Sequence, residues 1–179
     1  MTYPSFSAGE VLRAQDMNAV GMWLVKSQTI GAGVSTVPVT GAFSADYDVY
    51  LITVSGGVAS TNLGINLTLG ATITGYYSSG FNQAITASTI NATNTNNGTS
   101  WTSVAYGSTN ALSGQITLDN PFAAKRTMVS YQARATSNNY FVNQQHGFLD
   151  DNTSYTAFTL TVAGGNITGG TIRVYGLRN

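Results

Sequence analysis

Hydrophobic and polar residues alternate along most of this chain in short runs that predict β-strands. In the clearest run, Leu63 to Leu69, every second residue is leucine or isoleucine. Thr127 to Arg134 alternates in the same way. Because successive side chains of a strand point to opposite faces, we expect one face of each strand in a core and the other against water or a partner.

About ten strands are expected, separated by glycine, asparagine and serine. Gly31 to Gly33 would allow the first two to pair as a hairpin, and Pro38 favours an edge position for the second. The pattern predicts an all-β fold, an antiparallel β-sandwich of jelly-roll type, over residues 23–179. The expected strands are Trp23–Ile30, Val34–Val39, Tyr47–Val54, Leu63–Leu69, Trp101–Tyr106, Leu112–Leu118, Thr127–Arg134, Tyr140–Phe148, Tyr155–Val162 and Thr171–Leu177.

Residues 1–22 form a separate N-terminal arm in this interpretation. Ser7 and Glu10 have the spacing of a capping box, and Ala14 to Val20 predicts about two turns of helix before Gly21. A helix this short is marginal by itself. We therefore expect the arm to dock on its own domain or on a neighbouring subunit.

The stretch from Ser78 to Asn110 is rich in asparagine, threonine, serine and glycine, with Asn94 to Gly98 as its most turn-like part. We expect long loops here, interrupted by the short strand at Trp101. Aromatic rings beside amide-rich loops suit the binding of saccharides or proteins, although each ring alone also fits packing on the sandwich. The candidate receptor-contact residues are Tyr76, Tyr77, Trp101, Tyr106 and Tyr140.

Charge is scarce, because only 8% of the residues are charged where a typical soluble domain has about a quarter. The exterior must therefore consist of hydroxyls, amides and glycine, or be covered by other copies. A net charge of zero disfavours nucleic acid as a partner. No run approaches the ~20 apolar residues that cross a bilayer, so membrane insertion is not expected.

Catalytic chemistry finds little support in the residues. His146 is the single histidine, there is no cysteine, and no nucleophile motif is present. A polysaccharide hydrolase needs two carboxylates facing each other across a groove, and the few acids show no such spacing. The adjacent Asp150 and Asp151 fit a turn. We expect no enzymatic activity, no cofactor and no metal site.

Two segments carry recognisable motifs. Residues 6–18 read Phe-Ser-Ala-Gly-Glu-Val-Leu-Arg-Ala-Gln-Asp-Met-Asn, and Tyr155 to Thr161 is followed by Gly169 to Gly176. The first resembles the opening F-[ST]-A-G-E-V-L-x-A-x-D-M-N of minor tail and fibre proteins of tailed bacteriophages. The second is similar to the ending S-Y-T-x-F-T-L followed by G-G-T-I-R-V-Y-G in the same kind of virion protein.

The resemblance implies a phage virion structural protein, made in the bacterial cytoplasm and built into the particle. It implies a homotrimeric tail-fibre or receptor-binding component that meets a glycan or protein of the host surface. A capsid decoration protein on the phage head is the alternative. A closed trimer also hides sheet edges and uncharged faces. The residues expected to attach the arm to other virion proteins are Phe6, Glu10, Val11, Leu12 and Met17.

Overall fold

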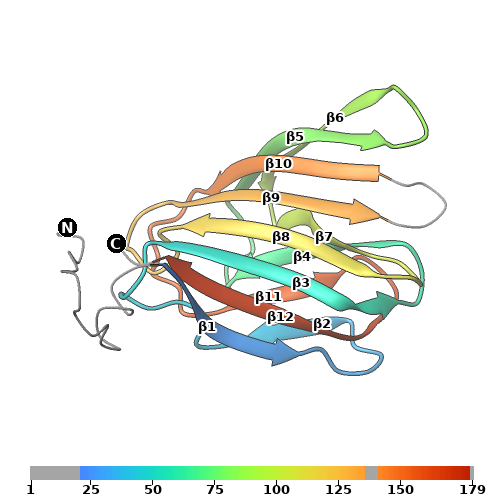
Figure 1. The fold of residues 1–179 in the computed structure, drawn as a ribbon. Coiled ribbons are helices and arrows are strands. Elements are labelled where there is room, and N and C mark those ends of the chain that lie inside the picture. The colour runs from blue at the N-terminus through green and yellow to red at the C-terminus, as the bar shows by residue number, and fades with distance from the viewer. Residues whose placement is uncertain (1–20, 136–140, 178–179) are drawn as a thin grey trace, which may run out of the picture.

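A computed structural model describes residues 21–135 and 141–177, and all of the regular structure in them is β-strand (Figure 1). Every pairing is antiparallel, and the strands form one continuous sheet. The described residues contain no helix, and so none that could span a membrane. The strands are β1 (Met22–Thr29), β2 (Thr36–Val39), β3 (Val49–Ala59), β4 (Leu63–Leu69), β5 (Tyr76–Ala84), β6 (Ile90–Gly98), β7 (Trp101–Gly107), β8 (Leu112–Asp119), β9 (Thr127–Ala135), β10 (Phe141–Leu149), β11 (Phe158–Val162) and β12 (Ile167–Leu177).

The all-β, antiparallel class predicted from the sequence is confirmed. In β4 the four alternating apolar side chains are at most 3% exposed, as expected for a face turned into a core. In β9 the alternation also holds, with Val129 and Tyr131 buried and Met128 exposed. The predicted helix from Ala14 to Val20 and the capping box lie outside the described residues.

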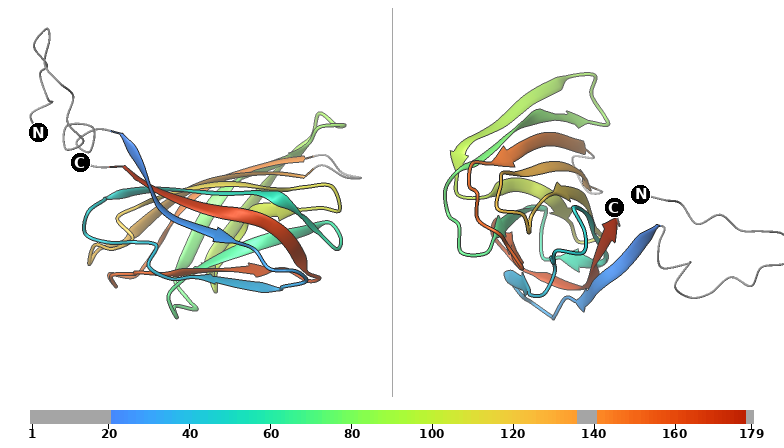
Figure 2. Two further views of the ribbon diagram at one scale, coloured as in Figure 1. Left: turned by 60° about the horizontal axis from the view of Figure 1, so that its bottom comes forward. Right: turned by 90° about the vertical axis from the view of Figure 1, so that its left-hand side faces the viewer.

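The sheet has two limbs. The short limb runs in the order β2-β11-β4-β7, and the long limb runs β1-β12-β3-β8-β9-β10-β5-β6. Figure 1 shows the long limb in front with the short limb behind it, and the end-on view of Figure 2 shows the sheet curling over. One hydrophobic cluster draws on both limbs, including Ile52 from β3 and Leu67 from β4. The other face of the long limb, called the outer face below, points away from this core.

The limbs meet at Gly114 in β8. This residue is in register with Val54 of β3, with Ala105 of β7 and with Ala133 of β9. Here β7 leaves the side of β8 and β9 takes its place. A Cβ atom on Gly114 would lie 2.4 Å from Cβ of Ala105 and 2.8 Å from its Cα, so only glycine fits.

The predicted hairpin between the first two strands is wrong. β1 pairs with β12 in the long limb, whereas β2 pairs with β11 in the short limb. Residues 31–33 therefore carry the chain from one limb to the other. The edge position predicted from Pro38 is confirmed, because β2 ends the short limb.

The long loops predicted between Ser78 and Asn110 are also wrong. This stretch contains most of β5 and all of β6, which pair with each other, followed by β7. The segment Asn94 to Gly98, which was predicted as a turn, belongs to β6. Only Asn97 in it has a turn-like backbone, with a positive φ of 51°. Among the described residues β6 pairs only with β5, so it is an edge strand, and most of its residues are polar and exposed or half-buried.

The crowding at Gly114 generates a stability prediction. Gly114→Ala forces a methyl group against the backbone of Ala105, and we expect it to lower the free energy of unfolding by about 1–3 kcal/mol or more. Gly31→Ala is the control, because its Cβ would approach only a side-chain methyl of Val34, at 3.3 Å. Urea unfolding of both variants measures the difference. Equal stability of the two variants would contradict a limb junction at Gly114.

Candidate functional site

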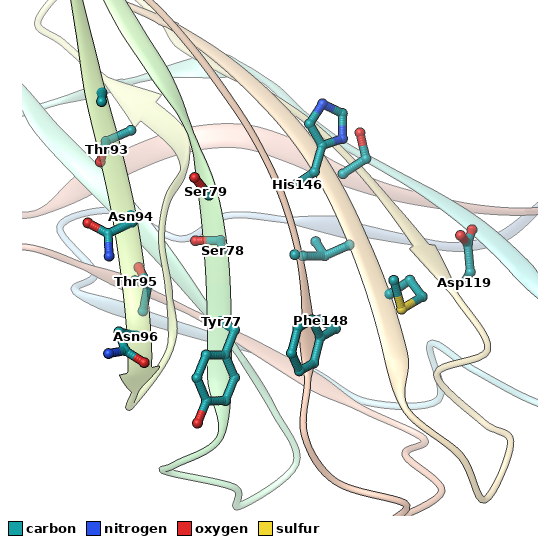
Figure 3. Close-up of a pocket in the computed structure, with 15 residues that line it drawn as sticks. Tyr77, Ser78, Ser79, Thr93, Asn94, Thr95, Asn96, Asp119, His146 and Phe148 are labelled. Carbon is teal, nitrogen blue, oxygen red and sulfur yellow. The ribbon is translucent and has the colours of Figure 1, made fainter.

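A groove of about 970 Å³ lies on the outer face at the β6 end of the long limb (Figure 3). Neighbouring strands of the limb supply its walls and floor, and β6 forms one side. Its volume is that of small-molecule sites in proteins, roughly 300–1,000 Å³. The lining residues are Tyr77, Ser78, Ser79, Ala92, Thr93, Asn94, Thr95, Asn96, Asp119, Met128, Val129, Ser130, His146, Gly147 and Phe148.

One register row across the groove is mainly apolar. Tyr77, Phe148, Met128 and Asp119 are successive cross-strand partners on β5, β10, β9 and β8. The rings of Tyr77 and Phe148 stack with centroids 5.1 Å apart and planes 16° apart. The Arg126 guanidinium lies 5.5 Å from the Phe148 centroid. The pair of rings is therefore held in place before any ligand arrives.

The next register row is polar. Asn94, Ser79, His146 and Ser130 are successive partners on β6, β5, β10 and β9. Asn94, Ser79 and His146 are exposed. Within the described residues, no hydrogen bond engages these four side chains. Their donors and acceptors are free to bind a ligand in place of water.

A buried hydrogen-bond network supports the groove from the core side. Ser78 donates to Oε1 of Gln145 at 3.0 Å and lies 3.2 Å from the Tyr131 hydroxyl. Nε2 of Gln145 donates to Oδ1 of Asn143 at 3.1 Å, and Nδ2 of Asn143 donates to the Ser103 carbonyl at 2.9 Å. Burial raises the pKa of Tyr131 to about 12, so the hydroxyl stays protonated at neutral pH. These bonds fix the strands that carry the groove.

The groove contains few ionisable groups. Burial raises the pKa of the Asp119 carboxyl above its usual value. Among the described residues that line the groove, Asp119, His146 and Tyr77 are the ionisable groups, and none is a lysine or arginine. Arg126, just outside, is paired with Asp150 at 2.6 Å. No cluster of three metal-ligating side chains occurs in the described part of the chain. The groove thus presents ring faces, hydroxyls and amides suited to binding.

The residues predicted to contact a receptor fall into three groups. Tyr76 and Trp101 are wrong as contact residues, because both are 0% exposed and pack edge to face in the core, 5.0 Å apart. Tyr77 lines the groove. Tyr106 is half-buried on β7 and does not line it, and Tyr140 lies outside the described residues.

The predicted attachment residues all lie outside the described residues. They are Phe6, Glu10, Val11, Leu12 and Met17.

Sequence reasoning missed Asn94, His146 and Phe148 as groove residues. Asn94 was placed in a loop because β6 has the composition of one. The run from Tyr140 to Phe148 was predicted as a strand, and its period of two puts His146 and Phe148 on one face. Gln145 lies on the opposite face of the strand and is buried although it is polar. The sequence therefore did not indicate which face of this strand points into the core.

A second feature, the apolar strip, occupies the β1 end of the same outer face. Here the two register rows of the groove continue as apolar residues on β1, β12 and β3. Met22 and Leu24 are 50% and 54% exposed, and Leu177 is 37% exposed. The residues of the apolar strip are Met22, Leu24, Leu177, Tyr175, Val49 and Leu51.

No model of a protein family matches this chain, and a search of curated proteins found no match.

Asp119 generates a pH prediction. Its raised pKa means that the folded state prefers the protonated carboxyl, so this group's contribution to stability is present below the unfolded pKa of about 3.9 and is lost as pH rises through the folded pKa. Asp119→Asn removes this pH-dependent loss of stability, because asparagine does not ionise. We expect the variant to gain stability relative to the original protein between pH 3 and pH 7, measured by urea unfolding. A stability difference that does not change with pH would contradict the raised pKa.

Proposed function

We propose that the protein is a non-enzymatic structural component of a tailed-bacteriophage virion, a tail-fibre or receptor-binding component that assembles as a homotrimer. The observation that carries this proposal is the division of one outer face into an apolar strip at the β1 end and an open groove at the β6 end. The apolar strip suits contact between copies, and the groove suits binding of a ligand. The proposal that the protein belongs to a virion rests on the resemblance of the two ends of the chain to phage virion proteins.

The apolar strip supports the homotrimer. Exposed apolar side chains that gather on one surface usually mark a contact with another protein. The strip includes Met22 and Leu24 of β1, a strand that pairs only with β12 among the described residues. Contact between copies would cover both the strip and this edge. The scarcity of charge supports the same proposal, since few ions would lose their hydration in such an interface.

We also propose that the curled sheet is a β-sandwich of jelly-roll type. In the short limb, strands from the first part of the chain alternate with later ones, in the order β2-β11-β4-β7. In the long limb, β3 on one side and β5 and β6 on the other enclose the meander β8-β9-β10. Such interleaving is typical of two Greek keys wound into a jelly roll, a fold common in virion proteins.

The oligomer is tested at the apolar strip. At micromolar concentration, light scattering coupled to size exclusion is expected to give the mass of three chains for the unaltered protein. We expect Leu24→Asp to give monomers, because it places a charge in the interface, whereas Leu24 is 54% exposed in the single chain and the fold should tolerate the change. Ile85→Asp is the control, because Ile85 is 66% exposed outside the strip.

Two results would count against the trimer proposal. A stable monomer of the unaltered protein would refute the trimer itself. A Leu24→Asp variant that remains trimeric would show that the copies meet elsewhere.

The receptor role is tested on cells of the bacterial host. Purified protein is expected to bind them saturably and to compete with phage adsorption. The number of copies in each virion separates the two locations: a few to a few tens indicate the tail, and hundreds indicate the alternative, a decoration protein on the head. Absence of saturable binding together with a high copy number would replace the receptor role with the alternative.

A further inference from the structure

We propose that the groove at the β6 end of the outer face is a binding site for a neutral oligosaccharide. This inference rests on the proposed receptor-binding role and names the chemical class of the ligand. The argument uses the two register rows, the charge of the lining and the hydrogen-bonding state of its side chains.

The two rows match the two sides of a sugar ring. Tyr77 and Phe148 belong to the apolar row, and Ser79 and His146 belong to the polar row on the same two strands. Residues two apart in a strand are separated by about 7 Å, so a pyranose ring can touch both rows together. Phe148 covers one face of the Tyr77 ring, so the apolar C–H face of the sugar would lie against the other face of Tyr77, while hydroxyls at the sugar's edge would meet the polar row. Of the two rings, Tyr77 lies nearer β6, on the side of Asn96 (Figure 3).

The charge of the lining selects against acidic ligands. A phosphate, uronic acid or sialic acid would find no lysine or arginine among the described lining residues and would meet the Asp119 carboxylate. Arg126 does not change this, because its guanidinium is paired with Asp150, with Nε donating to Oδ1 at 2.8 Å. A neutral ligand makes no ion pair. Asp119 accepts well from a hydroxyl donor.

The side chains of the polar row, which have no hydrogen-bonding partner among the described residues, can bind hydroxyls on neighbouring carbons of a sugar. The Asn94 amide offers two donors and one acceptor, and Ser79 and Ser130 offer hydroxyls. Polar residues facing the core behave differently. Ser78, Asn143 and Gln145 bond to protein partners there. The groove thus combines a fixed apolar row with a row of free polar groups, as sugar recognition requires.

Isothermal titration of the intact protein tests the proposal with a panel of trisaccharides. The neutral probes are maltotriose, cellotriose, mannotriose and triacetylchitotriose, and the acidic probe is trigalacturonic acid. We expect saturable binding of at least one neutral probe and none of the acidic one. Absence of binding by every neutral probe at millimolar concentration would overturn the proposal, as would tighter binding of the acidic probe.

Variants locate the site. Asn94→Ala is expected to weaken the neutral ligand about tenfold, because it removes hydrogen bonds made from an exposed position. Tyr77→Ala is expected to weaken it by about tenfold or more through loss of stacking. Asn91→Ala is the control, on the same strand but outside the groove. Thermal melts check folding. Unchanged affinity in a folded Asn94→Ala variant would place the ligand elsewhere and refute the site.

Cell binding separates this proposal from the proposed function. If the protein binds host cells saturably, and neither the neutral trisaccharides nor Asn94→Ala reduces that binding, the saccharide site is refuted and the receptor role stands. If neutral trisaccharides bind in the groove while host cells do not bind the protein, the site stands and the receptor role is refuted.

Discussion

The close approach of β7, β8 and β9 at Gly114 is the constraint on which the rest of the structure depends. The two limbs of this sheet separate where β8 exchanges β7 for β9 within its own length. The exchange needs glycine at position 114, because a Cβ there would lie 2.4 Å from Cβ of Ala105. Folding at this point encloses one core and leaves the opposite face of the long limb uncovered.

That outer face explains how a chain with so little charge can carry a function. Its register rows run without interruption from β1 to β5, so one surface changes from apolar to mixed character along its width. Leu24 and Tyr175 stand at one end of a row, and His146 and Ser79 stand at the other. Contact between copies and contact with a ligand can then use separate parts of one rigid sheet. In our proposal the low charge favours both, since neither contact needs an ion pair.

The sequence predicted individual strands better than their partners. Alternation found β4 and β9, because their apolar residues face the core with a period of two. The hairpin around Gly31 to Gly33 was wrong, because short turns permit a hairpin without requiring one, and the partners of β1 and β2 lie more than a hundred residues away. The strand β6 was missed because its order comes from pairing with β5. That error also misplaced the candidate site: Tyr76 and Tyr77 are neighbours in the chain, yet only a strand assignment tells which of them faces the core.

The central claim is that the β1 end of the outer face serves assembly while the β6 end stays open for a ligand. A crystal structure of the assembled full-length protein tests this claim most directly, because it shows which part of the face another copy covers. Our account predicts that Leu24 and Tyr175 are buried between copies and that Tyr77, Asn94 and His146 remain accessible. An assembly that covers the groove and leaves the apolar strip in solvent would contradict it.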